Sequence, residues 1–123
     1  MGYAERHDVA LTTDSSGDAT AYTPIVSGRV VTLVYTKTDF DNGVDFTITG
    51  DSSGETIWTE SNVNAAKTVR PRVATHDTAG VASLYAAAGE PVETPVVVAN
   101  ERIKVVIAQG GNVKTGKITV YIV

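Results

Sequence analysis

The chain has 123 residues, the size of a single domain, so we expect one domain over residues 1–123. It has no cysteine, which excludes a disulfide framework, cysteine-based zinc sites and a cysteine nucleophile. Its formal net charge of −4 disfavours binding to nucleic-acid phosphates, and no apolar run is long enough for a transmembrane helix. We therefore expect neither nucleic acid nor a membrane as a partner.

Short runs rich in β-branched residues, separated by turn clusters, dominate the first part of the chain. Residues 9–13 and 19–23 predict a strand and a returning strand, joined by Asp-Ser-Ser-Gly-Asp at residues 14–18. Residues 29–37 predict a longer strand. In it Val31, Leu33 and Tyr35 alternate and should share one face.

Two turn signals frame the next strands. Asn42-Gly43 is typical of a type I′ hairpin, which requires positive φ at both of its central residues. Residues 45–49 then alternate, with Phe46 and Ile48 on one face. A second Asp-Ser-Ser-Gly-acid turn at residues 51–55 leads into another alternating strand over residues 56–60.

The middle of the chain is less regular. Residues 62–77 predict an irregular connection with one or two edge strands, because Pro71 cannot donate a hydrogen bond within a central ladder. Residues 79–88 contain good helix formers and end before a glycine, a common C-cap, which predicts one short helix or 3₁₀ turn. Residues 94–99, 102–109 and 117–123 predict the final strands.

This pattern predicts an all-β fold, an antiparallel β-sandwich that is jelly-roll-like and has at most one short helix. Residues with strand periodicity, or in a continuous apolar strand, should form the core. They are Val31, Leu33, Phe46, Ile48, Ile57, Val97, Val105, Ile107, Ile118, Val120 and Ile122. The strands over residues 94–99 and 102–109 carry long apolar stretches, and either would need a partner chain if it lay at a sheet edge.

Acidic residues alternate in the segment from Asp39 through Asp41 to Asp45, as oxygen ligands do in a calcium loop. The segment lacks the glycine at the sixth position of an EF-hand, and its twelfth position is Gly50 rather than glutamate. A turn explains the same residues, so we expect no metal.

Two His-Asp pairs, His7-Asp8 and His76-Asp77, could form a metal site only if both met in space or across a subunit interface. Capping or turn roles are the default explanation for both pairs. The chain has no Gly-x-Ser-x-Gly elbow, phosphate-binding loop or dinucleotide fingerprint. We therefore expect no catalytic residues, no cofactor and no enzymatic activity.

Two further groups of residues suggest binding. Trp58 and Tyr35 could form an aromatic platform for sugars, which leaves a carbohydrate-binding β-sandwich module as an alternative. The only basic cluster, Lys67, Arg70 and Arg72, is more typical of a solvated loop than of a nucleic-acid site.

Three stretches of the chain resemble small structural proteins of tailed bacteriophages and prophages. They are Tyr-Ala-Glu-Arg-His-Asp at residues 3–8, Gly-Val-Asp-Phe-Thr-Ile-Thr-Gly at residues 43–50, and residues 99–111. The similarity runs along most of the chain, but it lies in such phrases rather than in a catalytic motif. No functional residue is carried over from it.

The resemblance implies a capsid decoration or cement protein, made in the cytoplasm of a bacterial host and bound to the outer capsid surface of the virion. Its partners would be the major capsid protein and further copies of itself in a symmetric homo-oligomer, a trimer rather than a dimer. A head–tail connector or a tail structural protein is the alternative within the same class.

Overall fold

The computed structural model describes residues 3–123, which form an all-β protein with no helix in that range and none that could span a membrane. The predicted helix over residues 79–88 is therefore wrong. The strands are β1 (Glu5–Thr12), β2 (Ala19–Tyr22), β3 (Val26–Lys37), β4 (Val44–Gly50), β5 (Thr56–Val63), β6 (Lys67–Val69), β7 (Val73–Ala74), β8 (Glu93–Thr94), β9 (Val96–Glu101), β10 (Ile103–Ala108) and β11 (Thr115–Ile122).

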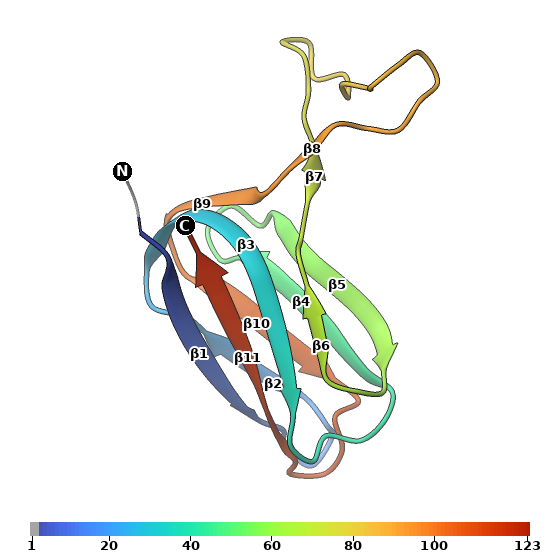
Figure 1. The fold of residues 1–123 in the computed structure, drawn as a ribbon. Coiled ribbons are helices and arrows are strands. Elements are labelled where there is room, and N and C mark those ends of the chain that lie inside the picture. Colours follow the sequence, from blue (N-terminus) through green and yellow to red (C-terminus); the bar gives the residue numbers. More distant parts are fainter. Residues whose placement is uncertain (1–2) are drawn as a thin grey trace.

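Two antiparallel sheets pack face to face (Figure 1). The first has the order β1-β11-β3, and both β6 and β9 pair with the outer side of β3. The second has the order β2-β10-β4-β5. If β6 and β9 are counted as one strand, each sheet has four strands, and their order is that of a jelly roll. The predicted antiparallel β-sandwich is confirmed.

Most connections cross from one sheet to the other. The turn between β4 and β5 is a hairpin, whereas β1 pairs with β11 and not with β2. Likewise β3 and β4 lie in different sheets, so the predicted hairpin at Asn42-Gly43 is wrong. Gly43 has the expected positive φ of 91°, but Asn42 does not, which excludes a type I′ turn. The buried Phe40 side chain anchors this crossing loop.

The core lies between the two sheets. All the predicted core residues are buried except Val31 and Val97, for which the prediction is wrong. The pairing of β3 with β11 shifts at Val31, because Ile122 pairs with Val30 while Tyr121 pairs with Thr32. This bulge turns Val30 inward in place of Val31. Val97 lies on the outward face of β9 and is 60% exposed.

An aromatic group fills the middle of the sandwich. Tyr35 packs on Phe46 with ring centroids 4.7 Å apart, and Phe46 stacks on Trp58 at 5.3 Å. Phe40 stacks on the other side of Tyr35 at 6.1 Å. Burial raises the pKa of the Tyr35 hydroxyl, which has no hydrogen-bond partner among residues 3–123.

Candidate functional site

A projecting arm interrupts one edge strand of the sandwich. Along β3, Leu33 pairs with Val69 of β6 and Val30 pairs with Val96 of β9, in the same antiparallel direction. β6 and β9 thus occupy the same place in the sheet, as two segments of one interrupted edge strand. The chain between them leaves the sheet and extends away from the sandwich (Figure 1). We call residues 70–95 the arm.

Backbone hydrogen bonds hold the arm together. β7 pairs with β8, and single bridges join His76 to Ala82 and Leu84 to Pro91. Near the centre of the arm three segments bond in a cycle: Thr75 N–H donates to the Val92 carbonyl, Val92 N–H to Ser83, and Ser83 N–H to Thr75. Because of these hydrogen bonds, the backbone of residues 79–88 is extended and not helical, although the sequence predicts a helix.

The arm has no core of its own. From Arg72 to Pro95 no residue is buried, and the large apolar side chains near the tip face outward. Val81 is 61% exposed, Leu84 44% and Tyr85 76%. A short hairpin-like element is marginally stable in water unless it packs against something. Exposed apolar side chains gathered in this way are typical of an interaction surface.

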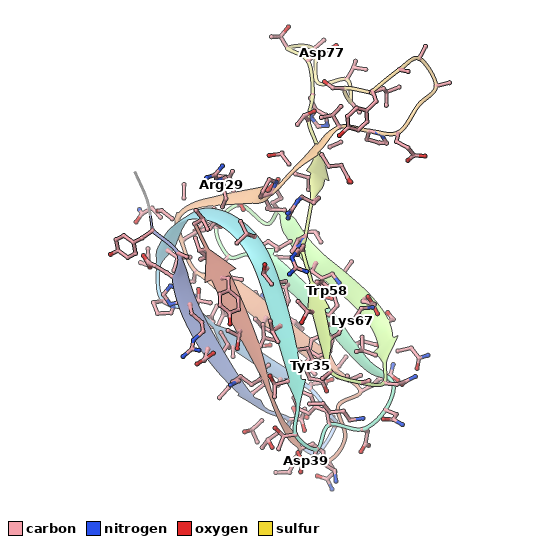
Figure 2. All side chains as sticks on the ribbon, viewed as in Figure 1. Arg29, Tyr35, Asp39, Trp58, Lys67 and Asp77 are labelled. Carbon is pink, nitrogen blue, oxygen red and sulfur yellow. The ribbon has the colours of Figure 1, made fainter. Side chains whose placement is uncertain are left out.

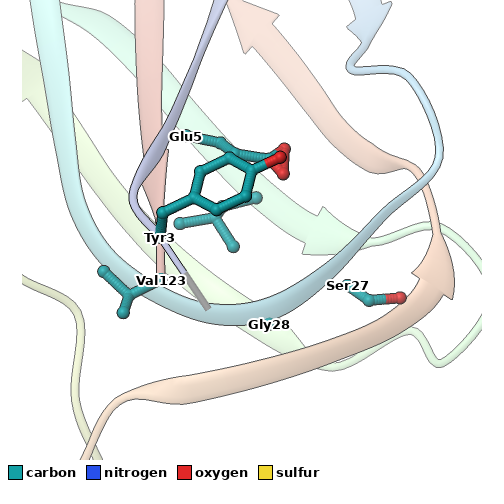
Figure 3. Close-up of a pocket in the computed structure, with 6 residues that line it drawn as sticks. Tyr3, Glu5, Ser27, Gly28 and Val123 are labelled. Carbon is teal, nitrogen blue, oxygen red and sulfur yellow. The ribbon is translucent and has the colours of Figure 1, made fainter. Parts of the chain in front are cut away.

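The end of the sandwich that carries the arm is also apolar. Tyr3, Ile25, Val97 and Val123 are all exposed large hydrophobic residues at or beside this end. Between β1, the start of β3 and the end of β11 lies a cleft of about 330 Å³ (Figure 3). Its lining residues are Tyr3, Glu5, Ser27, Gly28, Ile122 and Val123.

A glycine shapes the floor of this cleft. Gly28 has φ of 139°, and a Cβ there would lie 2.8 Å from both Ile122 Cγ2 and the Val123 carbonyl oxygen. Arg29, next to it, exchanges backbone hydrogen bonds with Val123 and pairs with Val97 on its other side. The cleft, the free edge of β9 and the root of the arm therefore form one continuous region.

Charge divides this region into two parts. The arm carries Asp77, Glu90 and Glu93, and residues 73–101 contain no lysine or arginine. At the root of the arm stand Arg70 and Arg72, and Arg29 lies at the same end of the sandwich (Figure 2). Within residues 3–123, none of these three arginines has a carboxylate within ion-pair distance.

The predicted basic cluster is split by the fold. Lys67 lies in β6, where its Nζ bonds Glu60 Oε2 at 2.6 Å, so it belongs to the surface of the sandwich. Arg70 and Arg72 instead flank the buried Pro71 at the root of the arm. The three residues therefore do not form one basic patch.

Two of the three carboxylates in the acidic segment, those of Asp39 and Asp45, accept hydrogen bonds from the chain itself. Asp39 accepts hydrogen bonds from the backbone N–H and the hydroxyl of Thr115, and the N–H bond is the main cause that lowers the pKa of Asp39. Asp45 accepts from Asn62 N–H and from the Gln109 side chain. Within residues 3–123 no cluster of three metal-ligating side chains occurs.

The two His-Asp pairs are not brought together. His7 lies in β1 opposite Val120, whereas His76 lies in the arm opposite Ala82. Asp8 accepts a hydrogen bond of 2.7 Å from the Thr119 hydroxyl, which is the main cause of its lowered pKa. Asp77 Oδ1 accepts from Ala79 and Val81 N–H and shapes the turn at the tip of the arm.

The aromatic pair does not form an exposed platform. Tyr35 is 1% exposed in the core, and Trp58 is half-buried against Phe46. The remaining exposed aromatic rings are Tyr3, Tyr22 and Tyr85, and Tyr22 is covered in part by the Arg102 guanidinium at 3.9 Å. Tyr3 lies at the arm-bearing end of the sandwich, and Tyr85 lies in the arm.

Sequence reasoning missed the arm. Val81, Leu84 and Tyr85 have helical spacing, which hid the fact that they lie on an exposed projection. The absence of any cation from residue 73 to residue 101 was the available signal. Comparison with known proteins found no family model and no curated protein that matches the chain.

Proposed function

We propose that this protein is a virion structural protein of a tailed bacteriophage, a decoration protein that binds the outer surface of the capsid and stabilises the shell. The observation that supports a role in assembly most strongly is the arm. It is an insertion without a core, and it exposes Val81, Leu84 and Tyr85. Exposure of these apolar side chains to water is unfavourable unless a partner covers them.

The fold is compatible with this role without proving it. Jelly rolls occur in viral capsid proteins, but also in lectins and in cupins, so the function has to come from the surface and not from the architecture. The phage assignment rests on the resemblance of residues 3–8, 43–50 and 99–111 to small phage structural proteins.

In this proposal the protein acts by binding alone. Its partners are the major capsid protein and further copies of the same chain in a symmetric homo-oligomer, for which we favour a trimer. Burial of apolar surface, repeated at every symmetry-related contact, would add stability to a shell that has already assembled. Carbohydrate binding receives no support from the aromatic pair, because Tyr35 is buried.

Quantitative mass spectrometry of purified particles tests this function. A decoration protein should be present at on the order of hundreds of copies per particle, as capsid symmetry requires, and a connector at about six or twelve. Particles from a phage that lacks the gene should assemble normally but rupture at a lower temperature. A copy number below about twenty would exclude decoration and favour a connector or tail protein.

A further inference from the structure

We propose that the arm of one copy docks on the arm-bearing end of a second copy of this chain. In this arrangement Leu84 and Tyr85 pack at the cleft between Tyr3 and Val123, and the carboxylates of the arm face the arginines at the neighbour's arm root. The proposal deepens the self-association part of the proposed function and does not depend on the identity of the capsid.

Both surfaces expose large apolar side chains. Of the large hydrophobic residues that are exposed, Val81, Leu84 and Tyr85 lie on the arm. Four more, Tyr3, Ile25, Val97 and Val123, lie at or beside the end that carries it. The arm thus supplies a compact projection, and the cleft supplies a concave apolar site of about 330 Å³. Aromatic and aliphatic anchors that enter such sites contribute most of the energy of many interfaces.

Charge complementarity identifies the occupant. Beyond its root, the arm has three carboxylates and no lysine or arginine over residues 73–95. Arg29, Arg70 and Arg72 have no ion-pair partner within the described part of their own chain. The acidic side chain in the lining of the cleft, Glu5, already faces His7 Nε2 at 3.4 Å. A second copy of this chain carries both the acidic arm and the three arginines. Each copy can therefore dock its own arm on a neighbour and bind the arm of another copy.

Within residues 3–123, the carboxylates of the arm form no ion pair with Arg29, Arg70 or Arg72. The arm leads away from the sandwich, with Asp77 at its far end and Arg29 at the sandwich end (Figure 2). Its internal hydrogen bonds, from Thr75 to Val92 and onward to Ser83, keep its path extended. The free edge of β9 lies beside the same surface and could add backbone pairing to the contact.

Light scattering coupled to size-exclusion chromatography, on the full chain over a range of concentrations, tests the proposal. We expect a wild-type oligomer that weakens at high salt, since part of its contact is electrostatic. Glu90→Lys with Glu93→Lys should weaken self-association roughly ten-fold or more, and so should Arg70→Glu with Arg72→Glu. The chain that carries all four reversals should recover the oligomer, because each reversed arm again meets an opposite charge.

Two matched controls separate this contact from general effects. Asp18→Lys with Asp41→Lys makes the same change in net charge at the other end of the sandwich and should leave the oligomer intact. Val81 and Val113 have the same exposed fraction, 61%, but Val113 lies at the end opposite the arm. Val81→Ser should weaken the oligomer, and Val113→Ser should not.

Three outcomes would overturn the proposal. The oligomer could persist unchanged in both charge-reversal variants, or the four-fold variant could fail to recover it while melting like the wild type. Alternatively, the wild type could be monomeric up to about 100 μM while the arm variants lose binding to purified capsids, which would make the capsid the occupant of the arm. That last result would leave the proposed function standing. Conversely, a low copy number per particle would exclude a decoration role but would not contradict the proposed docking of the arm of one copy on another copy.

Discussion

Glu101 is a buried carboxylate that fastens the β4–β5 hairpin to the edge of the other sheet. Its side chain lies at the end of β9 and is 6% exposed as a residue. One carboxylate oxygen, Oε1, accepts hydrogen bonds of 3.0 Å from both Ser52 N–H and Ser53 N–H. Gly50 makes room for it, because a Cβ there would lie 2.6 Å from Oε1.

The cost of removing this carboxylate follows from these contacts. A hydrogen bond to a charged group contributes about 1.5–3 kcal/mol. Ser52 and Ser53 are exposed, so their N–H groups could bond to water after the change, which lowers the loss per bond. We expect Glu101→Ala to reduce the free energy of unfolding by about 2–3 kcal/mol and Glu101→Gln, which keeps one acceptor, by about 1 kcal/mol.

The same contacts make this contribution depend on pH. The hydrogen bond from Ser53 N–H is the main cause that lowers the pKa of Glu101 in the folded protein from its ordinary value of 4.5, and the Ser52 bond adds to it. The stabilisation is therefore fully present above pH 4.5 and is lost as the pH falls through the lower pKa of the folded state. The difference in stability between wild type and Glu101→Gln should shrink over that interval.

Urea unfolding of wild type, Glu101→Gln and Glu101→Ala at pH 7 and at a series of pH values down to 3 measures both effects. Asp8 and Asp39 also have lowered pKa values, so all three proteins should lose stability in acid. The informative quantity is the difference between wild type and variant. A difference that stays constant from pH 7 to pH 3, or a loss below 0.5 kcal/mol in Glu101→Ala, would refute the reasoning.

Four further predictions concern the sandwich and the arm. Ile48→Ala and Ile107→Ala should each cost about 2–5 kcal/mol in urea unfolding, because both side chains are buried between the sheets, and losses under half a kcal/mol at both positions would contradict that placement. Gly43→Val should cost about 1–3 kcal/mol, because φ is 91° there, whereas Gly43→Asn should cost less; equal losses would show that the backbone conformation is not the cause. Gly28→Ala should cost at least about 1–3 kcal/mol, because its Cβ would meet Ile122 and Val123, and a neutral thermal melt would show that this approach relaxes freely. Replacement of residues 70–95 by a short linker should leave a folded sandwich with an unchanged β-type circular dichroism spectrum, since Val69 and Val96 lie opposite Leu33 and Val30; a disordered product would mean that the arm belongs to the folding unit.

Alternation along single strands could be predicted well from the sequence. Phe46 and Ile48 in β4, and Val105 and Ile107 in β10, face the core because each strand has one buried and one solvated face. The error at Val31 has a physical cause: a bulge adds one residue to β3 opposite β11, and the alternation changes face at that point. A single strand gives no sign of such an insertion.

Long-range pairing could not be predicted from local turns. Asn42-Gly43 favours a hairpin in isolation, but the burial of Phe40 and the pairing of β4 with β10 and β5 carry the chain to the other sheet. Local sequence also does not indicate which of the two apolar C-terminal strands lies at a sheet edge. β9 lies at an edge, whereas β10 is central between β2 and β4.

The arm could not be predicted because its local sequence favours a short helix. Residues 79–88 are rich in alanine, and Val81, Leu84 and Tyr85 would form the apolar stripe of a short helix. A helix of that length is marginal in water unless it packs against a surface. Backbone pairing with residues on both sides of this segment then stabilises an extended path.

The residues that stabilise the sandwich are largely separate from those that the arm exposes. The buried hydrophobic residues all lie outside residues 70–95, and the two parts of the interrupted strand remain aligned on β3. Substitutions at the tip of the arm should therefore alter its surface without opening a cavity in the core. At the root of the arm, Pro71 is buried and Val73 packs against the core, so the contribution of the arm to the sandwich is confined to its root. In the proposed contact, a partner that binds the arm would gain affinity because internal hydrogen bonds already order its path.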